Sequence, residues 1–112
     1  MNELIDKLRQ FADERDWHKY HSPKNLVMAL SVEISELLEH FQWLSQKESY
    51  ELSPGKLDKV RDEIGDVYIY LTMLSDKLGL DMVQAAFDKI EKNQKNYPAK
   101  VVRGKAKKYK EY

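Results

Sequence analysis

The hydrophobic and polar residues of this chain alternate with the period of an α-helix over most of its length. Apolar residues recur every three or four positions in four long segments, and no stretch with the two-residue period of a strand is long enough to predict a sheet. The pattern predicts helices over about 2–16, 23–44, 56–78 and 81–96. Four helices joined by short links indicate an all-α protein whose protomer is a four-helix bundle.

Residues that favour helix ends separate these segments. Ser22 followed by Pro23 matches an N-cap and the first position of a helix. Asp81 is a second candidate N-cap, Gly79 suits the position after a helix C-terminus, and Pro98 ends the last predicted helix. The four helices therefore have defined boundaries in the sequence itself.

The length of 112 residues suits one domain, which we expect over residues 1–98, followed by a basic tail over 99–112 whose segment 101–112 we expect to be irregular. The absence of cysteine excludes a disulfide framework and thiolate chemistry. No leader-like or membrane-spanning run is recognisable, so we expect a cytoplasmic protein that does not bind a membrane.

Charge is balanced overall but unevenly distributed. The net charge of zero argues against general attraction to a nucleic acid polymer. Residues 31–66 hold nine acids and four bases, whereas residues 100–112 hold six bases and one acid. The acidic middle could bind a metal and the basic tail a phosphate ligand. Alternatively, the tail is simply solvated.

Two pairs of carboxylates interrupt the apolar faces of the predicted helices. On the second helix Glu33 lies within the apolar arc and Glu36 at its edge, whereas Glu39 points to the far side. On the third helix Glu63 and Asp66 lie in the middle of the apolar arc. Residues three apart are neighbours on a helix surface. Each helix therefore aims one carboxylate pair inward.

Inward carboxylates need compensation, because an unpaired buried ion costs on the order of several kcal/mol. Protonating all four would require large upward pKa shifts. Pairing with a base is the second possibility, and Lys59 is the main base nearby. It precedes Glu63 by four residues, and a base before an acid makes a weaker helical pair than the reverse order. A divalent cation satisfies all four, and oxygen ligands favour Mg²⁺ or Mn²⁺ over zinc. The alternative is a solvated rim beside the core. A ferritin-like di-iron site is disfavoured. It requires a Glu-x-x-His motif on two helices, whereas here the residue three positions after each of Glu33, Glu36 and Glu63 is an acid and not a histidine.

The sequence EISE at 33–36, followed after a gap of 26 residues by EIGD at 63–66, resembles the ExxE…ExxD signature of the MazG-like all-α nucleoside triphosphate pyrophosphohydrolases. Further segments resemble the dCTP pyrophosphatase branch of that superfamily. In chain order they read FADERDW, HSPKNL, FQW, DVYIYL, NQKNYP and RGKAKKY. Two departures are His40, which the family pattern does not require, and Leu8, near which related dCTP enzymes can carry a histidine.

The resemblance implies a four-helix core in which Glu33, Glu36, Glu63 and Asp66 bind Mg²⁺, with Mn²⁺ as a possible substitute. It implies hydrolysis of dCTP or a related deoxynucleoside triphosphate to monophosphate and pyrophosphate, which cleans the nucleotide pool. It also implies a homo-oligomer, a dimer or a dimer-of-dimers tetramer, with sites completed between subunits. Either Glu33 or Glu36 can serve as the catalytic base that takes the proton of the attacking water.

The same resemblance implies that Trp17, Trp43 and Tyr70 line a base and sugar pocket. Stacking on a base is worth about 1–3 kcal/mol and tolerates different bases, although tryptophans near helix ends also serve as core residues. Asn25 is a candidate to contact the base edge or a phosphate, and an asparagine in a first helical turn also caps locally.

Basic and amide residues near the C-terminus are candidates to contact phosphates. Lys89 and Asn93 lie one turn apart on the fourth predicted helix and match family positions. Arg103 and Lys108 are candidates to close over the phosphates from the tail. A solvated face is the alternative for each of these residues.

Two features of the second predicted helix remain. His40, like His21 before the helix, is interpreted as a hydrogen-bonded structural histidine. Met28 and Val32 lie opposite the carboxylate face and indicate a second buried surface, as in an oligomer.

A non-catalytic helical dimerisation module with a structural metal site is the alternative function. The four intact carboxylates favour the enzyme.

Overall fold

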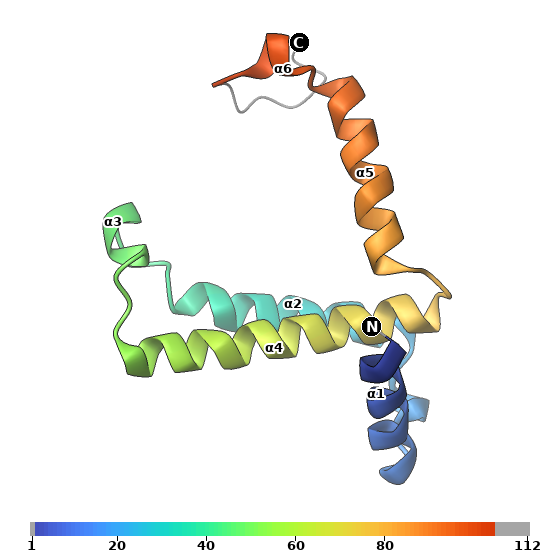
Figure 1. The fold of residues 1–112 in the computed structure, drawn as a ribbon. Helices are drawn as coiled ribbons and strands as arrows, with labels where there is room; N and C mark the ends of the chain where they lie inside the picture. The colour runs from blue at the N-terminus through green and yellow to red at the C-terminus, as the bar shows by residue number, and fades with distance from the viewer. Residues whose placement is uncertain (1, 105–112) are drawn as a thin grey trace. The chain divides into compact units, whose positions relative to one another are not determined.

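The computed structural model describes residues 2–104, and these residues form helices and turns without a strand. The predicted all-α class is therefore confirmed. In chain order the elements are α1 (Asn2–Glu14), the 3-10 helix η1 (His18–Tyr20), α2 (Pro23–Glu39), α3 (Gln46–Ser49), α4 (Pro54–Lys77), α5 (Met82–Asn96) and α6 (Ala99–Val102) (Figure 1).

Side-chain caps fix the starts of α2, α4 and α5. Ser22, Ser53 and Asp81 each accept a hydrogen bond from the backbone N–H three residues further on, at 3.1, 3.3 and 3.0 Å. Such a bond satisfies one of the N–H groups that a helix start leaves without a partner. Gly79 follows α4 with a φ of 66°, the left-handed conformation that favours glycine at this place. The predicted boundaries at residues 22, 79 and 81 are confirmed.

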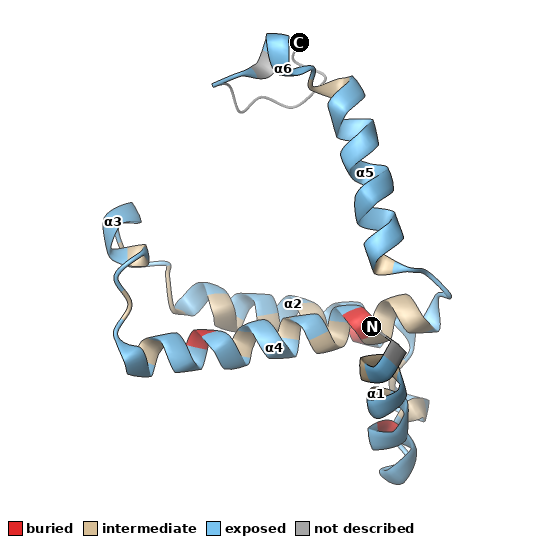
Figure 2. Ribbon diagram, viewed as in Figure 1, coloured by how far each residue is buried: buried red, intermediate tan, exposed pale blue. Residues whose placement is uncertain are grey.

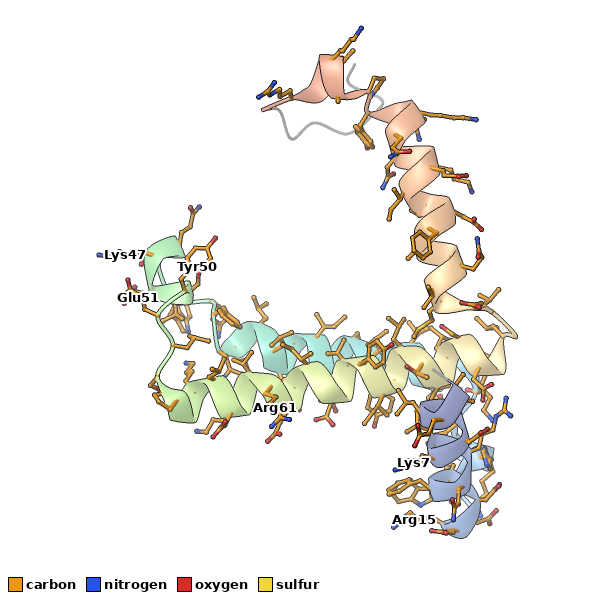
Figure 3. All side chains as sticks on the ribbon, in the orientation of Figure 1. Lys7, Arg15, Lys47, Tyr50, Glu51 and Arg61 are labelled. Atoms are coloured by element: carbon orange, nitrogen blue, oxygen red, sulfur yellow. The ribbon has the colours of Figure 1, made fainter. Side chains whose placement is uncertain are left out.

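The predicted end of the second helix is wrong. Helix α2 ends at Glu39 and not near residue 44, and His40 is its C-cap. After His40 the chain continues in turns, in which the Phe41 N–H donates to the Leu38 carbonyl and the Leu44 N–H to the Phe41 carbonyl, both at 2.9 Å. A capping box then starts the short helix α3: Ser45 accepts from the Glu48 N–H at 3.1 Å, and the Glu48 carboxylate accepts from the Ser45 N–H at 2.9 Å. The residues that follow α3 extend to solvent, as Tyr50 and Glu51 show in Figure 3.

The first compact unit of the chain ends at Gly79 and contains α1 to α4. In it α2 and α4 run antiparallel along each other, and α1 packs against α4 (Figure 1). A double hydrogen bond between the Arg9 guanidinium and the Asp76 carboxylate ties α1 to the last turns of α4. Few side chains are fully buried (Figure 2); among the described residues they are Ala12, Leu26, Val60 and Thr72.

The second unit begins at Leu80 and contains α5 and α6. The segment 101–112 was predicted to be irregular, but its first two residues belong to α6, a single helical turn that follows Pro98. The predicted domain boundary at residue 98 stays a prediction. None of the described helices combines the length and the apolar character that crossing a membrane requires.

Candidate functional site

Three of the four predicted carboxylates meet between α2 and α4. Glu33 and Glu36 from α2 and Glu63 from α4 each offer an oxygen, and these oxygens all lie within 4.8 Å of one another. All three side chains are half-buried. Asp66 is exposed and lies outside this group, yet its charge acts on both Glu33 and Glu63. Glu39, on the same helix as the first pair, is exposed and is not a member.

The crowding of like charges changes the acidity of this cluster. The pKa of Glu33 rises from 4.5 to about 7, first through burial, then through a hydrogen bond and Coulomb repulsion from Glu36, and then through the charges of Asp66 and Glu63. Burial and the same neighbours also raise the pKa of Glu63, whereas the charge of His40 opposes that rise. The cluster therefore resists carrying its full negative charge without a compensating cation.

Two oxygens of the cluster have no hydrogen-bond partner among the described residues. Glu33 Oε2 and Glu63 Oε2 are both buried from solvent. A buried acceptor without a partner is unfavourable, and an ion or water that binds it removes this cost. Because every candidate ligand is a carboxylate oxygen, the donor set fits a hard divalent cation such as Mg²⁺ or Mn²⁺.

A cavity of about 260 Å³ lies between the first helix and the C-terminal half of α4. Its lining is mostly apolar and aromatic, which is the usual character of a pocket for a small organic ligand. The residues that line it are Lys7, Leu8, Phe11, Trp17, His21, Ile69, Tyr70 and Met73. Two of the three aromatic residues predicted for the base pocket, Trp17 and Tyr70, are therefore brought to one cavity.

Tyr70 connects this cavity with the carboxylate cluster. It lines the cavity and lies one helical turn after Asp66. Burial raises the pKa of its phenol, and the charges of Glu33, Asp66 and Glu36 raise it further. Because these charges act on the phenol, the apolar cavity and the acidic cluster adjoin, as a ligand with an aromatic ring and an anionic tail would need.

The turn after α1 places Trp17 at the cavity. Asp16 has a φ of 53°, and the Trp17 N–H bonds to the Ala12 carbonyl at 2.9 Å, while the Asp16 N–H bonds to the Asp13 carbonyl at 3.2 Å. These two bonds form a Schellman motif at the helix C-terminus. The Trp17 ring then meets Phe11 edge-to-face, with centroids 5.6 Å apart.

The structure does not bring the remaining predicted residues to this cavity. The Asn25 amide donates to the Tyr20 carbonyl at 3.0 Å, which is a local contact. Trp43 is 87% exposed, the most exposed tryptophan of the chain, and does not line the cavity. Lys89 and Asn93 are exposed on α5 in the second unit. Their roles stay predictions.

Of the two tail residues proposed to close over phosphates, Arg103 is exposed in the second unit. Lys108 lies outside the described residues. The proposed phosphate contacts of both residues therefore stay predictions.

Six residues that line the cavity were not predicted as site residues from the sequence: Lys7, Leu8, Phe11, His21, Ile69 and Met73. His21 was interpreted as a hydrogen-bonded structural residue, yet its Nδ1 is buried and has no hydrogen-bond partner in the described part of the chain. Burial lowers the pKa of this imidazole, and the charges of Lys77 and His18 lower it further. These effects favour the neutral form of the imidazole at the cavity wall. Its place before a helix N-cap gave no indication of this position.

The described residues form an all-α fold with a carboxylate cluster between α2 and α4, and sequence comparison assigns the family. The MazG-like family model matches residues 28–112. This chain therefore belongs to the MazG-like family, as its motifs predicted.

Individual relatives are also similar. The chain is 40% identical to dCTP pyrophosphatase 1 of Mus musculus over 102 residues, and 38% identical to dCTP pyrophosphatase 1 of Homo sapiens over 104. These stretches cover 89% and 91% of this chain, which spans about 60% of the length of these relatives. The crystal structure of a pyrophosphatase from Archaeoglobus fulgidus matches with a TM-score of 0.83 at 46% identity, over 88% of this chain and 92% of that one.

Proposed function

We propose that this protein hydrolyses deoxynucleoside triphosphates, dCTP or a related dNTP, to the nucleoside monophosphate and pyrophosphate. The observation that carries the proposal is the three-carboxylate cluster beside an aromatic cavity in a chain of the MazG-like family. The named activity of the dCTP pyrophosphatases and the archaeal pyrophosphatase supports it.

Glu33, Glu36 and Glu63 are proposed to hold Mg²⁺, with Asp66 as a fourth carboxylate near the cluster. The fit rests on the two buried oxygens without a partner and on the all-oxygen donor set. When bound, the cation would neutralise the triphosphate and act as a Lewis acid on the phosphoryl group. Four carboxylates and a triphosphate repel each other in its absence, so we expect activity to depend on the metal.

Glu33 is the proposed catalytic base. Its pKa is about 7 in the metal-free protein, and a bound cation would favour the ionised carboxylate, which is the form that can accept a proton from water. Glu33 would take the proton of the attacking water as the new P–O bond forms and the P–O bond between the α and β phosphates breaks, which releases the monophosphate and pyrophosphate. Glu36 remains the alternative base, because it shares a hydrogen bond with Glu33.

The cavity is the proposed site for the base and sugar. Trp17 and Phe11 offer aromatic surface for stacking, and Tyr70 lies between the cavity and the carboxylates. The phosphates would then extend toward the cluster. Lys89, Asn93 and Arg103 are proposed phosphate ligands from the second unit.

We further propose a homo-oligomer, a dimer or a tetramer, whose sites are completed between subunits. Met28 and Val32 on α2 were predicted to lie on a second buried surface. In the single chain they are 57% and 55% exposed, so a second copy could bury them. Trp43 at 87% exposure is available to cover the cavity of a neighbouring subunit. In the first unit of a single chain, α2 and α4 form one packed helix pair. Burying these apolar surfaces between two copies would also complete a four-helix bundle.

A nucleotide panel tests this function. Each of the four dNTPs and four NTPs is incubated with the full chain and Mg²⁺, and pyrophosphate release is measured. We expect release from dCTP or a related dNTP and its loss on adding a chelator. If no nucleotide yields pyrophosphate at high protein concentration, the proposal is wrong and the non-catalytic module is favoured.

A further inference from the structure

His18 lies between the three parts of the chain that line the aromatic cavity. These parts are α1, the C-terminal half of α4 and the segment 17–21, which contributes Trp17 and His21. His18 belongs to this segment and starts η1. Its ring does not line the cavity but meets the His21 ring edge-to-face, with centroids 6.5 Å apart. Its carbonyl accepts from the His21 N–H at 3.1 Å, so His18 supports the wall from behind.

The two ring nitrogens of His18 contact α1 and α4. Nε2 lies 2.7 Å from Asp13 Oδ1 on α1, and Nδ1 lies 3.3 Å from Lys77 Nζ on α4. A lysine ammonium has only donors, so Nδ1 accepts, and the neutral ring then carries its hydrogen on Nε2, toward the Asp13 carboxylate. One tautomer therefore serves both contacts, and the ring bridges the two helices through the segment that carries Trp17.

This bridge adds a connection to those made by the turn after α1. The backbone N–H groups of Asp16 and Trp17 bond to carbonyls of α1, so these bonds tie Trp17 to α1 and not to α4. The contact between His18 and Lys77 joins the same segment to α4, one turn beyond Met73 of the cavity wall. We infer that His18 is a positioning residue for the nucleotide base, because it holds the Trp17 wall at a set distance from α4. The inference rests on the proposed function.

A second explanation is that the bridge only stabilises the packing of α1 on α4. The side chains of His18 and Asp13 are 37% and 72% exposed, and contacts this exposed contribute little to stability. The two explanations differ in kinetics. Loss of a positioned base wall raises KM and leaves kcat unchanged, because His18 is outside the carboxylate cluster. Loss of packing alone lowers the melting temperature and leaves both kinetic parameters unchanged while the protein stays folded.

The test compares the wild type with His18→Phe and His18→Gln in steady-state pyrophosphate release from the best nucleotide of the panel. Phenylalanine keeps a ring beside His21 and removes both nitrogens, whereas the glutamine amide again offers an acceptor and a donor. We expect His18→Phe to raise KM about fivefold, equivalent to about 1 kcal/mol, the upper end for contacts this exposed. Its kcat should stay within about twofold, and His18→Gln should retain the KM of the wild type. Lys19→Gln is the matched control, because it breaks an ion pair with Asp16 that does not reach α4, and it should also retain that KM.

Quenching of Trp17 fluorescence by acrylamide tests the position of the segment without a nucleotide. A Trp43→Phe background leaves Trp17 as the one tryptophan of the chain. In this background we expect His18→Phe to increase the quenching and His18→Gln to leave it unchanged. An unchanged KM or unchanged quenching in His18→Phe, or equal changes in both variants, would overturn the inference alone. A wild type that releases no pyrophosphate from any nucleotide would overturn the proposed function, and with it this role for His18.

Discussion

At the residue scale, Glu33 and Glu39 are an internal comparison of the same residue type on the same helix. Glu33 belongs to the carboxylate cluster and Glu39 is exposed outside it. We predict that Glu33→Gln lowers kcat for pyrophosphate release by about 100-fold or more, because general base catalysis typically contributes this much. Glu39→Gln should retain activity within about twofold. Equal activities of the two variants in a steady-state assay would contradict the assignment of Glu33.

The raised pKa of Glu33 predicts a pH dependence of stability in the metal-free protein. In the folded state this carboxyl has a pKa of about 7, against 4.5 ordinarily, so the folded state binds the proton more tightly than the unfolded state. The contribution of Glu33 to stability is therefore fully present below about pH 4.5 and is lost as the pH rises through about 7.

Mg²⁺ competes with that proton. We therefore expect the rise in melting temperature on adding Mg²⁺ to be larger at about pH 8 than at about pH 6, as measured by thermal unfolding at both values. Glu33→Gln should remove most of this difference, since glutamine has no proton to lose. A metal-induced shift that is independent of pH would count against the cluster as the metal site.

The acidic half of the site was accessible from the sequence, and the aromatic half only in part. Glu33, Glu36 and Glu63 were found because a carboxylate on an apolar helical arc conflicts with the periodicity around it. Phe11 and Met73 match that periodicity, so nothing in the pattern separates a cavity wall from a core position. Their place at the cavity depends on how α1 packs against α4, which brings together residues that are distant in the sequence.

At the scale of elements, the turn between α1 and η1 is the device that sets the position of Trp17. Asp16 adopts the left-handed conformation there without being glycine. We predict that Asp16→Val destabilises the fold by roughly 1–2 kcal/mol, because β-branched residues are strained at positive φ. Asp16→Gly should cost less, since glycine is favoured at this position of a Schellman motif. Chemical denaturation of the two variants tests this order, and the reverse order would show that the left-handed turn is not retained in solution.

The helix boundaries show what local sequence does and does not determine. Ser22 and Asp81 were predicted as caps because a cap is a local hydrogen bond that depends on residue type. The end of α2 was placed five residues too late, because Phe41 and Leu44 continue the apolar spacing. The chain leaves the helix at His40 and continues in turns until the capping box of Ser45 and Glu48 starts α3. Apolar spacing alone therefore does not show where a helix ends.

At the scale of the whole molecule, the exposed apolar face of α2 predicts self-association. Burying a side chain such as valine or methionine between copies contributes about 1.5–3 kcal/mol each. We expect the mass in light scattering to be two or four times the 13.3 kDa of one chain. Val32→Asp should shift the mass toward that of the single chain.

Gln46→Asp is the matched control, because Gln46 is polar and exposed and lies on α3, not on the Met28 and Val32 face of α2. A wild type that is monomeric at all concentrations would contradict the proposed oligomer. It would leave the carboxylate cluster as a site within a single chain.

The claim that most depends on measurement is cleavage of a nucleoside triphosphate to the monophosphate at the α2–α4 carboxylate cluster. Phosphorus NMR of dCTP incubated with the full chain and Mg²⁺ tests it directly, because each possible product has its own resonance. We predict dCMP and pyrophosphate in equal amounts from the wild type, and neither product from Glu33→Gln or after chelation. Formation of dCDP and inorganic phosphate, or unchanged product formation by Glu33→Gln, would contradict the claim.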